Sequence, residues 1–187
     1  TAVTSCGRFT KVALTKIGSP YVIAEFSELG KSFNRIAGFE ANGGFLLGSD
    51  IEIAGKPLAA LPTRDALLPV LMLLAAAGNS CISSLMMDLP QRFTHSDRIK
   101  DFPTTRSQDI LAAGIDNPDM LLANLGFEAM GVGYVDRTDG LRMTVSDGSI
   151  IHLRPSGNAP ELRCYVESGN ADTSHSMVYA CLSRLAN

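Results

Sequence analysis

The sequence predicts two units of mixed fold: an α/β layer arrangement in residues 1–87 and an α+β domain with a mainly antiparallel sheet in residues 108–187. In the first part, short strand-like and helix-like stretches alternate, which is typical of α/β layers. Residues 88–107 are rich in charge and proline and show little periodicity, which predicts a hinge between the units. In the last part, Asp147-Gly148 stands between two apolar runs and predicts a hairpin, the simplest antiparallel pair.

The first elements of the α/β part follow from turn and cap residues. Residues 11–15 predict a strand. The stretch 18–30 predicts a helix, because Ser19 can cap its first turn and Pro20 suits the first helical position, where no backbone donor is needed. Residues 33–48, FNRIAGFEANGGFLLG, predict a strand, a glycine-rich loop and a second strand.

The longest apolar run, ALLPVLMLLAAAG at 66–78, predicts a buried core helix. It is too short to span a bilayer, which takes about 20 helical residues. We expect Thr63 or Asp65 to cap this helix, and we expect Pro69 to kink it because proline removes one backbone donor.

The α+β part predicts helices, then strands, then a last helix. Residues 104–114 and 117–126 predict helices, residues 139–157 predict the two strands of the hairpin, and residues 161–168 predict a further strand. The tail at 172–186 is apolar along one side, which predicts a helix packed on the sheet. Its residues predicted to face the core are Met177, Val178, Cys181, Leu182 and Leu185.

Composition narrows the class of function. The chain has 45% hydrophobic and 19% charged residues, as globular proteins do, and its net charge of −3 creates no overall field for nucleic acid. The four cysteines are scattered, with no CxxC pair and no histidine cluster, which argues against a disulfide framework or a zinc site and favours the reducing cytoplasm. The first residues lack the pattern of a signal peptide. We therefore expect no nucleic-acid partner and no membrane partner.

The loop Arg-Pro-Ser-Gly-Asn-Ala-Pro at 154–160 lies between two predicted strands. Arg154 begins the loop, and Arg163 follows shortly after it. Small residues let backbone N–H groups point inward and form an anion-binding hollow. Ser156 and Asn158 add side-chain hydrogen-bond donors. Arg154 and Arg163 can grip phosphate or carboxylate oxygens with two parallel hydrogen bonds each. The alternative is a solvated hairpin turn with incidental arginines, and the spacing alone leaves it open.

A second loop, GFEANGG at 38–44, places the carboxylate of Glu40 near the amide of Asn42 between glycines. A carboxylate and an amide suit vicinal hydroxyl groups, and glycine lets the backbone approach a ligand closely. The alternative is a β-turn with an exposed glutamate. Lys16 lies just before the predicted helix at 18–30, where it either meets an anion together with the helix N-terminus or is simply solvated.

The histidines carry no catalytic signature. His95 falls in the predicted hinge, His152 on a predicted strand and His175 near a predicted helix start. None is paired with an obvious nucleophile, so we expect no Ser/His/Asp triad.

Three stretches of this chain resemble loops of the α-D-phosphohexomutase superfamily and follow one another in the same order as there. RPSGNAPELRCYVE is similar to its phosphate-binding loop, R-P-S-G-T-E-P-x-x-R-x-Y-x-E; GFEANGG is similar to its sugar-binding loop, G-E-x-S-G; TKIGSPYV resembles the stretch T-K-V-G-x-x-Y-V before it. The stretch LPQRFTHSDRIKDFPT resembles the corresponding stretch in the bacterial, phosphomannomutase/phosphoglucomutase-like members of this superfamily. The resemblance covers nearly the whole chain.

The resemblance implies a protein of four domains, of which this chain corresponds to the C-terminal half. Residues 1–87 would be a partly complete third domain, 88–107 a hinge, and 108–187 the fourth, phosphate-binding domain. Two family motifs are absent from the chain and are expected upstream: T-A-S-H-N-P, whose serine carries the phosphoryl group, and D-x-D-x-D-R, which binds magnesium. We therefore expect no catalytic residue and no metal ligand in this chain, which alone would be inactive. Mg²⁺ is expected only in the full-length enzyme, through its second domain.

By the same resemblance, the full-length protein is an isomerase of the intramolecular phosphotransferase type. It would move a phosphoryl group between positions 1 and 6 of a hexose phosphate through a phosphoserine and a bisphosphate intermediate. Its expected partners are the hexose phosphate and the N-terminal domains of the same chain. The residues implied in binding the sugar are Glu40, Asn42 and Gly43. Those implied in binding phosphate are Arg154, Ser156, Gly157, Asn158 and Arg163, with Lys16 as an accessory.

Departures from the family pattern leave the identity of the sugar substrate undecided. Asn42 stands where most members have serine, and the Glu-Ala-Asn-Gly form also occurs in acetylglucosamine-phosphate mutases. Ser19 and Gly44 stand where some members carry histidine, so no proton-transfer role is carried over to them. Asn158 and Ala159 replace Thr-Glu, although Asn158 keeps a donor. Two alternatives therefore stand beside a phosphomannomutase: an acetylglucosamine-phosphate mutase, and a non-catalytic phosphosugar-binding or regulatory module.

Overall fold

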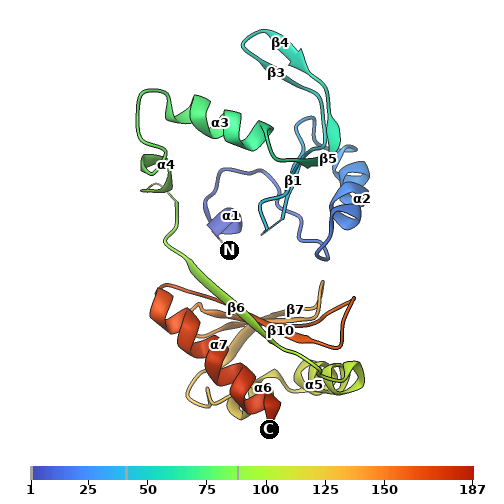
Figure 1. Cartoon of the computed structure of the whole chain (residues 1–187), viewed down its shortest axis with the longest axis vertical. Helices are drawn as coiled ribbons and strands as arrows, with labels where there is room; N and C mark the ends of the chain where they lie inside the picture. Colours follow the sequence, from blue (N-terminus) through green and yellow to red (C-terminus); the bar gives the residue numbers. More distant parts are fainter. Residues whose placement is uncertain (1, 41, 88) are drawn as a thin grey trace. The chain divides into compact units, whose positions relative to one another are not determined.

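The computed structural model describes residues 2–40, 42–87 and 89–187. The chain divides into two compact units, Phe9–Leu89 and Pro90–Asn187, and the residues before Phe9 go with the second unit. Both units combine helices with β-sheet (Figure 1). The predicted fold class is confirmed, with an α+β arrangement and an antiparallel sheet in the C-terminal part.

The unit Phe9–Leu89 holds short strands and three described helices. Its elements are α2 (Ser19–Leu29), β1 (Ala37–Phe39), β2 (Phe45–Leu47), β3 (Ile51–Ile53), β4 (Lys56–Leu58), β5 (Leu61–Asp65), α3 (Leu68–Ala77) and α4 (Ser84–Met87). Strands β1, β2 and β5 form one antiparallel sheet in that order, and β3 pairs with β4. Helix α2 packs against β1 and β5. The glycine-rich loop thus lies between two paired strands, as predicted.

Two local predictions near the start of this unit are wrong. Residues 11–15 do not form a strand. Helix α2 begins at Ser19, and its N-cap is Gly18, whose φ of 135° suits glycine; no side chain caps it. The hydroxyl of Ser19, the predicted cap, donates instead to the carboxylate of Glu40 at 3.0 Å. A tertiary partner has therefore replaced the local one.

Helix α3 is the predicted apolar helix, but the prediction that it is buried is wrong. Only Ala77 is buried, and Leu71 and Leu74 are each 52% exposed. Apolar residues cover all sides of the helix, a pattern typical of a buried helix. In the described part of this unit, however, only α4 packs closely against it.

The ends of α3 follow simple backbone chemistry. Asp65 Oδ1 accepts hydrogen bonds from the N–H groups of Leu67 and Leu68 at 2.8 and 3.0 Å, and so binds the chain where α3 begins. The N-cap is Leu67 and no side chain caps the helix, contrary to the prediction of Thr63 or Asp65. Pro69 lies in that first turn, where its missing N–H loses no helical hydrogen bond. The predicted kink has no cause at this position.

The unit Pro90–Asn187 is built on a five-stranded antiparallel sheet in the order β6-β10-β9-β8-β7. Its elements, with the short N-terminal helix α1 (Ala2–Ser5), are β6 (Phe93–Ile99), α5 (Thr104–Asp116), α6 (Pro118–Asn124), β7 (Val132–Asp136), β8 (Leu141–Val145), β9 (Ile150–Pro155), β10 (Leu162–Ser168) and α7 (Ala171–Ala186). The Asp147-Gly148 turn joins β8 to β9, with Gly148 at a φ of 80°. The hairpin prediction is confirmed.

The predicted hinge at 88–107 is largely regular structure. Strand β6 pairs with β10 along its whole length, from Phe93 opposite Ser168 to Ile99 opposite Leu162, and α5 begins at Thr104. The prediction of an irregular connection is wrong for these residues. Most of β6 is exposed at the edge of the sheet, where charged side chains are common, so its sequence lacks an apolar alternation.

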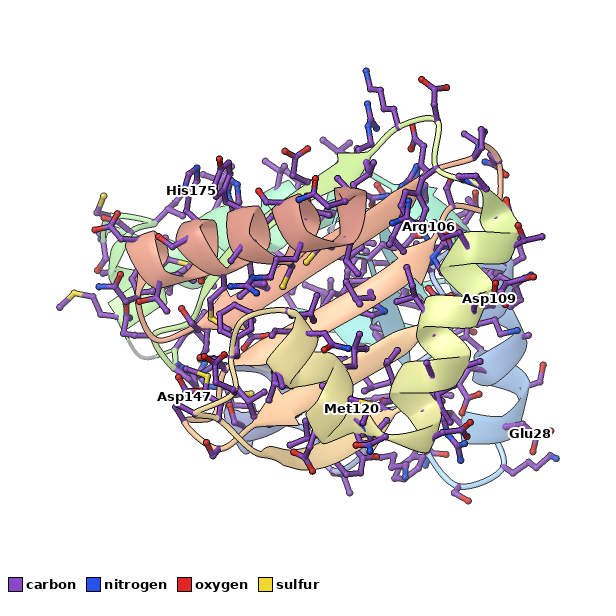
Figure 2. All side chains as sticks on the ribbon, turned by 90° about the horizontal axis from the view of Figure 1, so that it is seen from below. Glu28, Arg106, Asp109, Met120, Asp147 and His175 are labelled. Atoms are coloured by element: carbon purple, nitrogen blue, oxygen red, sulfur yellow. The ribbon has the colours of Figure 1, made fainter. Side chains whose placement is uncertain are left out.

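The helices α5, α6 and α7 lie on one face of the sheet (Figure 2). Alternate residues of the central strands, such as Leu153, Leu162, Cys164 and Val166, point into the core that these helices cover. All five residues predicted to bury one side of the last helix are buried in α7. The opposite face of the sheet carries the polar residues of the same strands.

Candidate functional site

The two arginines that flank the predicted phosphate loop face each other across neighbouring strands. Arg154 near the end of β9 is in register with Arg163 near the start of β10. Residues directly opposite in an antiparallel pair extend from the same face of the sheet. Their neighbours Leu153 and Leu162 are buried in the core, so both guanidinium groups lie on the face away from the helices. The structure thus brings together the two arginines that the sequence proposed as a pair.

An acidic residue that the sequence did not indicate holds Arg154. Its Nε lies 2.6 Å from Oδ2 of Asp139, and the two side chains are 15% and 18% exposed. Gly140 makes this approach possible: its φ is +86°, and a Cβ there would lie 2.4 Å from the carbonyl oxygen of Leu153. Only glycine fits at this point, so the Asp139 turn can lie directly against β9.

Glu161 is the carboxylate nearest to the other arginine. Its Oε2 lies 3.4 Å from Nη2 of Arg163, and its Oε1 lies 3.6 Å from Nε of Arg98 on β6. A hydrogen bond with Tyr165 raises the pKa of Arg163 above its ordinary value, and Glu161 adds to that effect. Asp139, Glu161 and Arg98 are functional candidates that sequence reasoning missed. Arg98 is opposite Arg163 through strand register, Asp139 reaches Arg154 from the turn before β8, and Glu161 lies two residues before Arg163.

The ion pairs leave part of the guanidinium donor capacity unused. The contact between Arg154 Nε and Asp139 lacks hydrogen-bond geometry, and the Nε atoms of Arg154 and Arg163 are buried without a hydrogen-bond partner. A buried donor without a partner costs about 1–3 kcal/mol.

The loop between the arginines is held by hydrogen bonds of its own backbone, and one side of it is exposed. The N–H of Ser156 donates to the carbonyl of Glu161 at 2.8 Å, and the N–H of Asn158 lies 3.4 Å from the hydroxyl of Ser156. Ser156 is buried, whereas Gly157 and Asn158 are exposed. A Cβ at Gly157 would meet no atom within 4 Å. A ligand can therefore approach the backbone at Gly157 closely.

His152 lies on the same strand face as Arg154, with Nε2 against the carbonyl oxygen of Asp139. Burial lowers its pKa below the ordinary value of 6.5, and the nearby Arg142 and Arg154 act in the same direction. The ring is therefore neutral at pH 7 and adds no charge beside the arginines. It positions the Asp139 turn.

In the other loop, Glu40 is an enclosed carboxylate. Its side chain is 7% exposed, and its Oε2 accepts hydrogen bonds from the Ser19 hydroxyl at 3.0 Å and from Arg64 Nε and Nη2 at 2.8 and 2.6 Å. The alternative of a turn with an exposed glutamate is wrong. Arg64, on β5, was not indicated by the sequence because it lies 24 residues away.

The backbone of this loop turns tightly around Glu40. The N–H of Gly43, at a φ of +88°, donates to the carbonyl of Glu40 at 2.9 Å, and Oδ1 of Asn42 accepts from the N–H of Gly44 at 3.0 Å. A Cβ at Gly44 would lie 2.9 Å from Glu40 Oε2 and 3.0 Å from Arg64 Nε. The predicted sugar-binding residues are thus gathered in one turn, with Asn42 serving partly as a turn former.

Lys16 is exposed near the start of α2, with its Nζ 5.9 Å from the centre of the Tyr21 ring. This contact places the ammonium group beside an aromatic ring of the first turn of α2. Lys16 belongs to the same unit as Glu40, whereas Arg154 and Arg163 belong to the unit Pro90–Asn187.

Neither a candidate metal site nor a membrane-spanning helix occurs among the described residues. Within residues 2–40, 42–87 and 89–187, no group of three or more His, Cys, Asp or Glu side chains is placed to hold a metal ion. No helix in the described part of the chain has the length and apolar character needed to cross a bilayer. The four cysteines are free thiols.

Comparison with known proteins supplies an independent finding. Residues 98–178 match the family "Phosphoglucomutase/phosphomannomutase, C-terminal domain". The chain is 49% identical over 182 residues to a phosphomannomutase of Salmonella muenchen, and this alignment covers 97% of the chain and 38% of that relative. It is 40% identical over 174 residues to a phosphomannomutase of Sinorhizobium fredii (strain NBRC 101917 / NGR234), covering 90% of the chain and 36% of that relative. The chain thus spans little more than a third of the length of these curated relatives.

Proposed function

The chain belongs to the phosphohexomutase superfamily, as its C-terminal region, and from this premise we propose that it binds a hexose phosphate for a mutase reaction. In this proposal one loop grips the phosphate that does not react, and the other contacts the sugar hydroxyls. The phosphate-binding residues are Arg154, Ser156, Gly157, Asn158 and Arg163. The sugar-binding residues are Glu40, Asn42 and Gly43, with Lys16 as an accessory cation.

The observation that carries the proposal is the registered pair of arginines around an open loop. Like charges directly opposite on a sheet face are unfavourable, and this cost is offset when an anion lies between them. The Nε of Arg163 is buried without a hydrogen-bond partner, and the Nε of Arg154 faces Asp139 at 2.6 Å. Guanidinium groups bind phosphate oxygens with two parallel hydrogen bonds, so a phosphate can use donors that Asp139 and Glu161 leave unused.

The arrangement around Glu40 supports the sugar-binding part of the proposal. Arg64 and Ser19 both bind Oε2, so these contacts leave Oε1 as the acceptor for sugar hydroxyls. The same two donors fix the orientation of the carboxylate before the ligand arrives. A preoriented acceptor loses little rotamer entropy on binding.

We propose that the longer protein is an intramolecular phosphotransferase. Its phosphoserine, outside this chain, would donate a phosphoryl group to the hexose phosphate, and the resulting bisphosphate would turn around and return the other group. Arg154 and Arg163 would hold whichever phosphate is not reacting, and Glu40 would accept hydroxyls in both orientations. We propose that Mg²⁺ binds outside these residues, where it would neutralise charge on the transferred group. The chain by itself would then interconvert no hexose phosphates.

Mannose phosphate is the substrate we propose, because both curated relatives carry the name phosphomannomutase. Acetylglucosamine phosphate is the competing substrate to test, because Asn42 stands where most members of the family have serine. We propose a cytoplasmic location, since scattered cysteines without a CxxC pair are typical of reducing compartments.

Isothermal titration of the chain with mannose 6-phosphate tests the proposal. Charge-assisted hydrogen bonds contribute about 1.5–3 kcal/mol each, so Arg154→Ala or Arg163→Ala should weaken binding by about one to two orders of magnitude. Mannose without phosphate should bind much more weakly to the parent chain.

The matched control is Arg35→Ala, which removes an exposed arginine from the other unit. It should leave the affinity unchanged. If Arg154→Ala and Arg163→Ala both bind mannose 6-phosphate as the parent does, the loop is only a turn. Measurable mutase turnover by the purified chain would refute the division of roles between this chain and the rest of the protein.

A further inference from the structure

We infer that Arg98 is a third arginine of the phosphate site and selects for a doubly charged ligand. The inference rests on the proposed function and extends it to a residue of the stretch 88–107, for which the sequence predicts a hinge. Arg98 on β6 is in register with Arg163 on β10, which is itself in register with Arg154 on β9. Three arginines therefore form a row across three adjacent strands.

The row lies on one face of the sheet. Residues directly opposite share a face, and both Arg163 and Arg98 reach Glu161. Neighbouring strands are about 4.8 Å apart, so the row spans roughly 10 Å at the backbone. Long side chains that converge from this width can contact a single phosphate group. The loop with the exposed Gly157 lies at the same end of β9 and β10.

Charge balance in the row favours an anionic ligand. The ion pairs join three guanidinium groups to two carboxylates, those of Asp139 and Glu161. Glu161 serves two arginines with its two oxygens, at 3.4 and 3.6 Å, which is longer than the 2.6 Å contact of Arg154 with Asp139. One positive charge is left over, and Glu161 holds its two partners loosely. An arriving phosphate can therefore recruit them without losing a strong ion pair.

Exposure increases along the row, which separates the role of Arg98 from that of the other two. The side chain of Arg154 is 15% exposed, that of Arg163 33% and that of Arg98 46%. Arg154 is fixed at the root of the loop, whereas Arg98 lies at the sheet edge and can move toward a ligand. Strand β6 is held by backbone pairing from Phe93 to Ile99, so the fold does not depend on the Arg98 side chain.

A third guanidinium matters most for a dianion. A phosphate ester carries nearly two charges at pH 7, because its second pKa is about 6. A sulfate ester of the same sugar has a similar shape and one charge. If Arg98 interacts with the second negative charge of the phosphate, its removal should weaken phosphate binding more than sulfate binding. This difference separates a contact with the ligand from a general change in the fold.

The experiment compares mannose 6-phosphate and mannose 6-sulfate by calorimetric titration of the chain. Arg98→Ala and Arg98→Gln should each weaken phosphate binding by about three- to tenfold, a modest effect because the group is partly exposed, and sulfate binding by less than about twofold. Lys100→Ala is the matched control, since it removes an exposed positive charge two residues away. It should change both affinities by less than about twofold.

The outcomes are separable from those of the proposed function. If Arg154→Ala weakens phosphate binding but neither Arg98 variant differs from Lys100→Ala, the inference fails and the proposed function stands. An equal loss for phosphate and sulfate in the Arg98 variants also overturns the inference. If the parent chain binds no mannose 6-phosphate, both fail. Thermal unfolding followed by circular dichroism should show parental folding for Arg98→Gln, which keeps the test valid if Arg98→Ala perturbs β6.

Discussion

The two units differ in how fully they enclose their apolar residues. In Pro90–Asn187, one cluster of buried side chains joins the sheet to its helices, and α7 buries six residues. In the described part of Phe9–Leu89, the buried hydrophobic residues are Val22, Ile36, Leu46, Leu47 and Ala77. Helix α3 is apolar on all sides, yet Leu71, Leu73 and Leu74 are exposed. The phosphate loop therefore rests on a self-contained sheet, whereas the Glu40 loop belongs to a unit that does not cover its own apolar helix.

The difference also appears in how each candidate site is held. Arg154 and Arg163 extend from strands of six and seven residues at the centre of a five-stranded sheet. Glu40 lies between strands of three residues, and its position depends on side-chain bonds from Ser19 and Arg64. We expect the first site to tolerate changes elsewhere in the chain better than the second.

The largest expected effect compares two helical leucines, one from each unit. Leu122 of α6 is fully buried, and Leu71 of α3 is half exposed. Leu122→Ala should lower the free energy of unfolding by about 2–5 kcal/mol, because it leaves a cavity in the core. Leu71→Ala should change it by less than about 0.5 kcal/mol. Urea unfolding followed by circular dichroism measures both, and similar losses in the two variants would contradict the comparison.

A second prediction concerns the support of Glu40. Arg64→Ala removes two hydrogen bonds from an enclosed carboxylate, which should cost about 1–3 kcal/mol locally. Hydrogen exchange at the amides of Gly43 and Gly44 should accelerate by about tenfold or more, since both amides donate within this turn. The control is Arg35→Ala, an exposed arginine of the same unit. Unchanged exchange in Arg64→Ala would show that the ion pair does not hold the loop.

The third prediction is a pH dependence of the second unit. Burial lowers the pKa of folded His152 below 6.5, so the unfolded chain takes up its proton first as pH falls. The stability from His152 is complete above about pH 6.5 and is lost as pH falls from there toward the lowered pKa of the folded state. His152→Gln should flatten this slope in unfolding measurements between about pH 7 and pH 5.5. The exposed His175, changed to Gln, should leave the slope as it is.

The smallest expected effect is at Lys16. Its contact with Tyr21 is exposed, so Lys16→Ala should alter the stability of the first unit by less than about 0.5 kcal/mol. Any role of Lys16 would appear instead in the affinity for a sugar phosphate. A loss of stability above about 1 kcal/mol would mean that Lys16 organises the start of α2.

Local patterns predicted the elements whose burial follows from their own sequence. The apolar side of α7 and the Asp147-Gly148 hairpin are of this kind, as is the strand-loop-strand around Glu40. The failures come where tertiary context decides. Strand β6 is polar because it is an edge strand, and α3 is apolar although it is exposed in this structure.

The candidate sites show the same division. Turn chemistry and resemblance indicated Arg154 and Arg163, and sheet register then placed them opposite each other. The carboxylates and arginines that support the sites were not identified from the sequence. Arg64, Arg98 and Asp139 come from distant strands or turns, whereas Glu161 lies two residues before Arg163.

Backbone NMR titration of the chain with mannose 6-phosphate tests the central claim most directly. The account predicts saturable shifts at the amides of Ser156, Gly157 and Asn158, with none from unphosphorylated mannose. In Arg154→Ala the same shifts should need about ten- to hundredfold more ligand to saturate. The core amides of α7 should stay unchanged, since α7 covers the opposite face of the sheet. Saturable binding that leaves these three loop amides unshifted, or that keeps the parental affinity in Arg154→Ala, would contradict the assignment of this loop to phosphate.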